Sequence, residues 1–171
     1  MKKGIFLVGM PGAGKTGWGR RVAARFALRF YDTDEMIEQR EGKEIPEIFE
    51  AGGEPYFRAL EQKVLAELVN GSAEPFVCST GGGLPADPVN FRMMKEAGVI
   101  IYLKADINTL MRHLQHARKE RPLLAGDTEH RLQQLLSARK AIYEQADYTF
   151  DTAEFSPEHI KPIIDLCIKQ Q

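Results

Sequence analysis

Residues 9–16, GMPGAGKT, combine glycines with a lysine and a threonine at the spacing of a phosphate-binding loop. Gly9, Gly14, Lys15 and Thr16 meet that pattern. Glycines let backbone N–H groups turn inward around phosphate oxygens, and the N-terminus of the next helix adds a positive dipole. We therefore expect Lys15 to bind the β- and γ-phosphates of a nucleoside triphosphate and Thr16 to ligate Mg²⁺. The alternative is a glycine-rich turn without a ligand.

The loop alone does not define a reaction, because switches, motors and small-molecule kinases all use it. A guanine-specific switch would need an NKxD-type motif, which the sequence lacks, and 171 residues are few for a motor. A kinase that phosphorylates a nucleotide or a metabolite is therefore the leading class. The residues that we expect to hold its nucleotide belong to the loop and the start of the next helix: Gly12, Ala13, Gly14, Lys15, Thr16 and Gly17.

Two carboxylates, Asp32 and Asp34, flank a single residue at the end of an apolar run. If this run is a strand, the alternation of side chains directs both carboxylates to the same side. Beside a phosphate loop, Asp32 could hold Mg²⁺ through water, and Asp34 could accept a hydrogen bond or a proton from a substrate hydroxyl. The alternative is a pair of carboxylates that cap the following helix.

An arginine and a glycine triplet are the other candidates for contact with an acceptor. The planar guanidinium of Arg58 suits a carboxylate or a phosphate, although the arginine could instead pair with Glu54 or Glu61. Three consecutive glycines at residues 81–83 cost backbone entropy, which makes sense where a ligand lies directly on the main chain. A flexible turn is the alternative. Ser79 stands where P-loop kinases often position a water bound to Mg²⁺.

Short apolar runs alternate with stretches of helical period, which indicates a parallel sheet buried on both faces. We expect strands at residues 5–8, 30–32, 76–79, 99–103 and 148–150. We expect helices at residues 15–27, 34–41, 54–69, 88–96, 107–115, 129–146 and 157–168, the last with Ser156 as its N-cap. Ligands of such sheets bind at the carboxyl ends of the strands, where the polar and glycine-rich clusters begin.

Composition indicates one soluble domain. The 171 residues suit a single core, and the formal net charge of −1 gives no general attraction to nucleic acid or anionic membranes. The two cysteines, Cys78 and Cys167, show no metal or disulfide spacing, and Cys78 lies in an apolar run that predicts burial. The apolar run at residues 5–8 is too short for an export signal, and no stretch reaches the roughly 18 apolar residues of a membrane span. We expect a cytoplasmic protein.

In their order and spacing, these motifs resemble those of the shikimate kinases, relatives of the nucleoside monophosphate kinases. The resemblance covers nearly the whole chain. The segments that carry it are the P-loop, DTD at 32–34, GGEPYFRALE at 52–61, STGGG at 79–83, RPLL at 121–124, and AR…IYEQAD at 138–147.

The resemblance implies ATP-dependent phosphorylation of the 3-hydroxyl of shikimate, with Mg²⁺, in aromatic amino acid biosynthesis. It also implies an α/β fold of three layers, the P-loop kinase fold, with a five-stranded parallel sheet of order 2-3-1-4-5. Residues 1–171 would form one domain, with a substrate-binding segment at about 33–61 and a mobile lid at about 112–127.

The resemblance further implies roles for single residues. The catalytic residues would be Lys15, Asp34 and Arg121, with Arg121 reaching the transferring phosphate from the lid. Arg112 would stack on adenine, near the loop 151–157, and Arg112 and Arg121 would both contact the nucleotide. Shikimate would be bound through its hydroxyls, its carboxylate and the glycine backbone by Asp34, Arg58, Gly81, Gly82, Gly83 and Arg139. The metal residues would be Thr16 and Asp32.

Three alternatives stay open. A gluconate kinase would also need arginines for the carboxylate of its substrate. A nucleic-acid-binding protein could use the basic stretch at residues 112–121, although this stretch lacks interleaved aromatic residues. A nucleotide-binding module without catalysis would be indicated by loss of Lys15, Asp34 or Arg121, and all three are present. We expect a monomer that binds ATP and shikimate but neither nucleic acid nor membranes.

Overall fold

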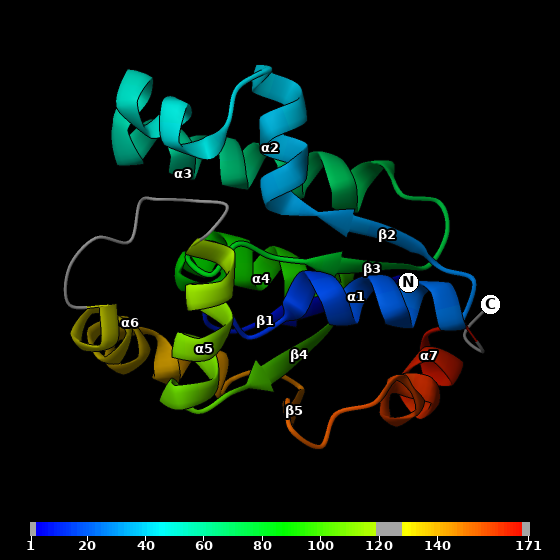
Figure 1. Cartoon of the computed structure of the whole chain (residues 1–171). Helices are drawn as coiled ribbons and strands as arrows, with labels where there is room; N and C mark the ends of the chain where they lie inside the picture. Colours follow the sequence, from blue (N-terminus) through cyan, green and yellow to red (C-terminus); the bar gives the residue numbers. More distant parts are fainter. Residues whose placement is uncertain (1–2, 119–127, 169–171) are drawn as a thin grey trace.

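A parallel five-stranded sheet forms the centre of the molecule, in the order β2-β3-β1-β4-β5 (Figure 1). The computed structural model describes residues 3–118 and 128–168. The strands in chain order are β1 (Gly4–Val8), β2 (Arg29–Asp32), β3 (Phe76–Ser79), β4 (Gly98–Lys104) and β5 (Tyr148–Asp151). This order and the parallel pairing confirm the predicted fold.

Helices follow the strands and join them. The α-helices are α1 (Lys15–Arg25), α2 (Thr33–Glu41), α3 (Ile45–Gly71), α4 (Pro88–Ala97), α5 (Ile107–Arg118), α6 (Thr128–Tyr143) and α7 (Lys161–Ile168). Two short 3-10 turns, Leu84–Ala86 and Pro157–Ile160, precede α4 and α7. In Figure 1, α2 and α3 lie beyond the β2 edge of the sheet. They make up most of the predicted substrate-binding segment.

The two faces of the sheet are covered by different helices because side chains alternate along each strand. From β1, Phe6 and Val8 pack into one core with residues of α3, α4, α5 and α6. Ile5 and Leu7 pack into a second core with residues of α1 and α7. β1 and β3 are therefore buried on both sides, as their continuous apolar runs predicted, whereas most residues of the edge strands β2 and β5 are not buried.

Two helices differ from the sequence-based expectation. α3 begins at Ile45 rather than near residue 54, because a capping box between Glu44 and Glu47 starts an earlier helical segment. That segment meets the predicted helix at Gly53, whose φ of 71° and ψ of −177° produce a kink. The last helix was expected from residue 157, but a 3-10 turn precedes it. Ser156 is the N-cap of that turn.

Three further expectations concern the lid, the burial of Cys78 and membrane-spanning segments. Residues 112–118 of the predicted lid belong to α5, and residues 119–127 lie outside the described part of the chain. Cys78 is fully buried, as predicted. Within residues 3–118 and 128–168, no helix combines the length and the hydrophobicity that crossing a membrane requires.

Candidate active site

The phosphate-binding loop connects β1 to α1 at the carboxyl end of the sheet. Gly12 and Gly14 adopt φ angles of +84° and +80°, a region that residues with a side chain rarely enter. A β-carbon at Gly12 would also lie 3.0 Å from Leu114 Cγ of α5. The loop can therefore turn its N–H groups inward only because glycines occupy these positions.

Lys15 lies at the first position of α1 with only 8% of its surface exposed. Its Nζ donates hydrogen bonds of 2.9 Å to the carbonyl oxygens of Gly9 and Met10. Burial lowers the pKa of Lys15 to about 8, against the opposing effect of Asp34 and Asp32. Lys15 forms no salt bridge with any described residue. An anionic ligand on the loop would supply the missing counter-charge.

Oxygen atoms from the first turn of α1 and from the ends of β2 and β3 meet beside this lysine. Thr16 Oγ1 donates a 2.6 Å hydrogen bond to Asp32 Oδ2 and lies 3.3 Å from Ser79 Oγ. Asp32 Oδ1 accepts from the backbone N–H groups of Asp34 and Glu35, which makes Asp32 the N-cap of α2. The capping alternative therefore holds for Asp32, which at the same time presents its carboxylate to the phosphate loop.

Asp34 does not reach the site by strand alternation, and that part of the prediction was wrong. β2 ends at Asp32, and Asp34 stands in the first turn of α2. Its Oδ1 is buried and has no hydrogen-bond partner among the described residues. Burial is the main cause that raises the pKa of Asp34 to about 6, with the nearby Asp32 adding to it. Asp34 Oδ1 is therefore available to accept a hydrogen bond from a ligand.

Three charged side chains lie along the glycine triplet at residues 81–83. A β-carbon on the first glycine would be 2.6 Å from Asp34 Oδ1, and one on the second would be 3.2 Å from Arg139 Nη1. On the third, it would overlap the guanidinium of Arg58. The absence of side chains thus allows one acceptor and two cations to gather along a few residues of main chain.

Arg58 pairs with Glu54 and Glu61, the two glutamates that were its alternative partners in the sequence. Its Nε and Nη2 donate to Glu54 Oε1 at 3.2 and 2.9 Å, and its Nη1 donates to Glu61 Oε2 at 2.7 Å. Glu61 is 1% exposed, and burial raises its pKa. A guanidinium has five N–H donors. These three contacts therefore leave two donors of Arg58 for a ligand.

Arg139 faces the triplet from the last turns of α6. Within the described ranges it takes part in no salt bridge. One turn later, the hydroxyl of Tyr143 donates a 2.6 Å hydrogen bond to the Gly82 carbonyl. Burial raises the pKa of Tyr143, while Arg139 acts in the opposite direction. This hydrogen bond holds α6 against the triplet. It therefore places the guanidinium of Arg139 beside Gly82 without adding a negative charge that would neutralise the guanidinium.

A cavity of about 370 Å³ brings most of the predicted residues together. Its lining includes the loop, both aspartates and the first two glycines of the triplet: Gly12, Gly14, Lys15, Thr16, Gly17, Asp32, Asp34, Ser79, Gly81 and Gly82. Ala13 is absent from this lining, because its side chain belongs to the core and its N–H donates to Met10. Arg139 lies beside the lining residue Gly82, and Arg58 lies beside Gly83, which follows Gly82 in the chain. Arg121 lies outside the described residues.

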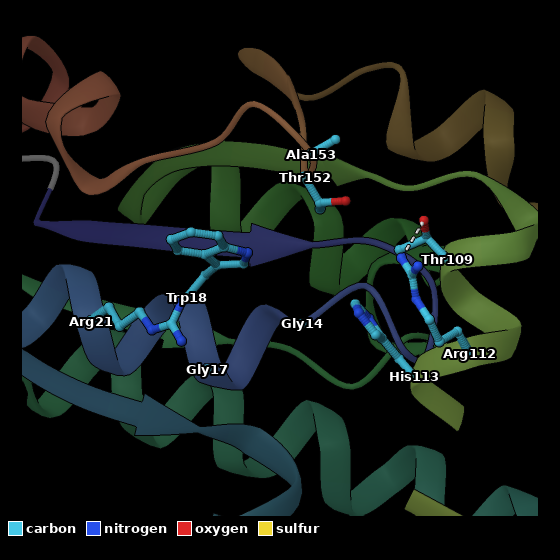
Figure 2. Close-up of a pocket in the computed structure, with 9 residues that line it drawn as sticks. All are labelled: Gly14, Gly17, Trp18, Arg21, Thr109, Arg112, His113, Thr152 and Ala153. Carbon is cyan, nitrogen blue, oxygen red and sulfur yellow. Dashed lines mark hydrogen bonds between the residues drawn. The ribbon is translucent and has the colours of Figure 1, made fainter. Parts of the chain in front are cut away.

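A second cavity of about 390 Å³ adjoins the first and shares Gly14, Gly17 and His113 with it (Figure 2). Arg112, the predicted adenine contact, lines this cavity. Thr152 and Ala153 line it as well, so the loop 151–157 reaches the place that the resemblance implied. A nucleotide with its phosphates on the loop therefore has room for its nucleoside here.

Several residues of the site were not predicted. Tyr143 stands four positions after Arg139, and Trp18 stands three positions after Lys15, so helical spacing could have indicated both. His113 Nδ1 donates a 2.7 Å hydrogen bond to the Gly12 carbonyl. This contact joins α5 to the phosphate loop, and no motif in the sequence signals it.

Comparisons with known proteins agree with this geometry. The family model described as shikimate kinase matches residues 11–168. The chain is similar to the shikimate kinase of Nitrobacter winogradskyi, with 42% identity over 167 residues that cover 97% of this chain and 75% of the relative. It is also similar to the solved structure of shikimate kinase from Acinetobacter baumannii in complex with shikimate. That similarity has a TM-score of 0.85 and 34% identity, and covers 100% of this chain and 96% of the other.

A gluconokinase from Sinorhizobium meliloti shares 15% identity at a TM-score of 0.55, over 100% of both chains. This likeness concerns the fold alone. The kinase family implied by the other matches uses ATP as co-substrate. Since the family model spans most of the residues and the relatives align over nearly the full length, the chain belongs to the shikimate kinase family.

Proposed function

We propose that this chain transfers the γ-phosphoryl group of ATP to the 3-hydroxyl of shikimate, with shikimate 3-phosphate and ADP as products. The observation that carries the proposal is the row of Asp34, Arg139 and Arg58 along the glycine triplet, next to the phosphate loop. Shikimate is a small cyclic carboxylate with several hydroxyls. One acceptor and two guanidinium groups are a chemically matched receptor for it.

The carboxylate of shikimate would be bound by Arg139 and by the two N–H donors of Arg58 that its glutamates leave unused. Glu61 supports this arrangement, because its buried carboxylate fixes the guanidinium of Arg58. Bidentate contacts of this kind define an orientation as well as an affinity. With the carboxylate held at this end of the triplet, the opposite side of the ring faces Asp34 and the phosphate loop.

Asp34 would accept the hydrogen bond of the 3-hydroxyl at its unpartnered Oδ1. As the hydroxyl oxygen forms its bond to the γ-phosphorus, the bond between this phosphorus and the β–γ bridging oxygen breaks, and Asp34 takes up the hydroxyl proton. A carboxyl whose pKa lies near 6 suits this exchange better than an ordinary aspartate. Phosphoryl transfer depends chiefly on alignment and charge, and the site supplies both.

The donor phosphates would lie on the loop with Lys15 as their cation. Mg²⁺ is a hard cation that prefers oxygen ligands, and Thr16, Asp32 and Ser79 present such oxygens beside the loop. The Thr16 hydroxyl donates its hydrogen bond to Asp32 and keeps lone pairs for a metal, so the donor set fits the ion. When bound, Mg²⁺ would offset the charge of the β- and γ-phosphates.

We also propose roles that follow from the resemblance rather than from described contacts. Arg121 would contact the transferring phosphate, and residues 112–127 would form the lid over the site. The protein would act as a cytoplasmic monomer of one domain, with small-molecule substrates and neither nucleic acid nor membranes as partners.

A coupled assay of ADP formation tests the proposal. Purified protein is supplied with ATP and Mg²⁺ and with shikimate, gluconate or a nucleoside monophosphate in parallel reactions. Among the three acceptors, we expect only shikimate to cause release of ADP. Phosphorus NMR of that reaction should show a new phosphate monoester. ADP formation with gluconate but not with millimolar shikimate would favour the gluconate kinase alternative and overturn the proposal.

A further inference from the structure

The cavity next to the phosphate loop has one indole side chain in its lining, that of Trp18. Trp18 belongs to α1 and stands three positions after Lys15, so the two side chains project from neighbouring parts of one helical face. The other side of the cavity is formed by Arg112 and His113 of α5 (Figure 2). The tryptophan thus lies where a nucleoside would follow its phosphates.

Two side chains contact the indole, and the backbone of Gly14 lies beside it. The ring of Phe155 meets it edge to face at a centroid distance of 4.9 Å and an angle of 89°. The guanidinium carbon of Arg21 lies 4.9 Å from the indole centroid. A β-carbon on Gly14 would be 3.4 Å from Cδ1 and 3.7 Å from Nε1 of the indole. A side chain that two neighbours already hold can contact a ligand without a large further loss of rotamer freedom.

The edge of the indole that carries Cδ1 and Nε1 lies beside Gly14, at the junction of the two cavities. In Figure 2 this nitrogen is on the side of the ring toward Arg112 and His113. No described residue accepts a hydrogen bond from Nε1. An indole N–H with polar surroundings on one side and an apolar ring behind it offers both a donor and a contact surface.

We propose that Trp18 is a nucleoside-binding residue of this enzyme. Its ring packs against the nucleoside of ATP, and its Nε1–H donates to an oxygen of the ribose or of the α-phosphate. This places the nucleoside between α1 and α5, and the short helical distance from Trp18 to Lys15 couples the position of the nucleoside to that of the terminal phosphates. The inference rests on the proposed use of ATP at this site but not on the identity of the acceptor.

The first test uses the fluorescence of the protein itself, because Trp18 is the single tryptophan of the chain. Emission is followed during titration with ADP, with inorganic tripolyphosphate and with shikimate, each with Mg²⁺, while calorimetry establishes saturation. We expect ADP to quench or shift the emission and tripolyphosphate, which has no nucleoside, to change it far less. Unchanged emission at saturating ADP would overturn the inference.

The second test separates the ring from its N–H group. Trp18→Phe keeps an aromatic ring without the donor, and Trp18→Leu removes the ring. We expect the KM for ATP to rise about tenfold in Trp18→Leu and less in Trp18→Phe, because stacking on an aromatic side chain is a large share of nucleobase affinity. The KM for the acceptor and the kcat at saturating ATP should stay close to those of the parent.

Phe26→Leu is the matched control, since Phe26 packs against the same core at the other end of α1 but does not line the cavity. Thermal unfolding of all variants identifies losses of stability. If Trp18→Leu raises the KM for ATP no more than Phe26→Leu does, the indole is only a core residue and the inference is wrong. Quenching by ADP in a protein that fails to phosphorylate shikimate would contradict the proposed acceptor and leave this inference standing.

Discussion

Asp34 Oδ1 lies 2.6 Å from the position that a β-carbon on Gly81 would occupy. Real β-carbons do not approach an oxygen this closely, so residue 81 has to be glycine for Asp34 to keep its place. The triplet at residues 81–83 is therefore a surface of close contact rather than a flexible turn. The same relationship makes the position of the proposed catalytic carboxylate sensitive to a single methyl group.

Gly81→Ala should lower kcat/KM for shikimate by about 100-fold, because a displacement of about 1 Å at a reacting group costs that much. The KM for ATP should change little, since the phosphate loop is untouched. Gly71→Ala is the control, as a β-carbon at Gly71 meets nothing within 4 Å. Steady-state kinetics of both variants provide the comparison, and equal kinetics would show that Asp34 does not need its described position.

Asp34→Asn should reduce kcat by about 100-fold or more, because the amide cannot take up the hydroxyl proton. The amide has nearly the same shape as the carboxylate, so the fold and the affinity for ATP should persist. Single-turnover measurements together with calorimetric titration of ADP separate the two effects. A variant with parental turnover would exclude Asp34 as the proton acceptor.

The same substitution should increase stability near neutral pH. Because the folded-state pKa of Asp34 is raised to about 6, its stabilising contribution is present below the unfolded value of 3.8 and is lost as the pH rises through 6. Above pH 6 the ionised carboxylate is therefore unfavourable, and Asp34→Asn should gain about 1–3 kcal/mol in free energy of unfolding. Denaturant unfolding at pH 4 and pH 7.5 tests this, and a gain of equal size at both pH values would contradict it.

The pH dependence of kcat/KM should be bell-shaped. Activity should rise with deprotonation of Asp34, whose pKa lies near 6, and fall with loss of the charge on Lys15, whose pKa lies near 8. Because the two groups interact, the two limbs belong to the pair. Binding of ADP, measured by calorimetry, should weaken above pH 8. In Lys15→Arg that alkaline weakening should disappear, since a guanidinium keeps its charge.

Arg139→Ala should raise the KM for shikimate by about 30-fold or more, corresponding to a loss of roughly 2–5 kcal/mol in binding free energy. Stability should change little, because Arg139 has no salt bridge with the described residues. Arg131→Ala, on the same helix, is the matched control for the loss of one positive charge. Similar KM values for the two variants would remove Arg139 from the carboxylate site.

Arg58→Ala should raise the same KM but also destabilise the fold, because it leaves the carboxylate of Glu61 buried without its partner. The Arg58→Ala, Glu61→Gln double variant removes this buried charge and separates the two effects. Stability should recover in the double variant, as measured by thermal unfolding, while the KM for shikimate should stay high. Recovery of both quantities would show that Arg58 serves the fold alone.

Functional residues that are close together in the sequence could be predicted from it. Contacts between elements that are far apart in the chain could not. The glycine loop, Lys15 and Thr16 are consecutive, so their geometry follows from one strand, one turn and one helix. Asp34 was placed by strand alternation, but the side chain of Asp32 binds the N–H of Asp34 and starts α2 early. Side-chain capping competed with the strand and ended it, which the pattern of apolar residues could not indicate.

The arrangement around the triplet could be predicted only in part. A ligand on the glycine backbone was expected, but the sequence does not show which charged side chain faces which glycine. That depends on the kink at Gly53, which sets the direction of the helix carrying Arg58, and on the hydrogen bond from Tyr143, which fixes α6. These are tertiary contacts between residues far apart in the chain, and no local spacing rule contains them.

Lys15 and Arg139 form no salt bridge with a described residue, and Asp34 Oδ1 accepts no hydrogen bond from one. Without substrates, the pocket therefore contains two cations without a salt bridge and a buried acceptor without a donor among the described residues. Each substrate would supply different partners. The phosphates of the nucleotide would pair with Lys15, and the hydroxy acid would donate a hydrogen bond to Asp34 and pair its carboxylate with Arg139. The ternary complex is therefore the most cohesive state of the molecule, and occupancy by either compound should tighten the protein around the place reserved for the other.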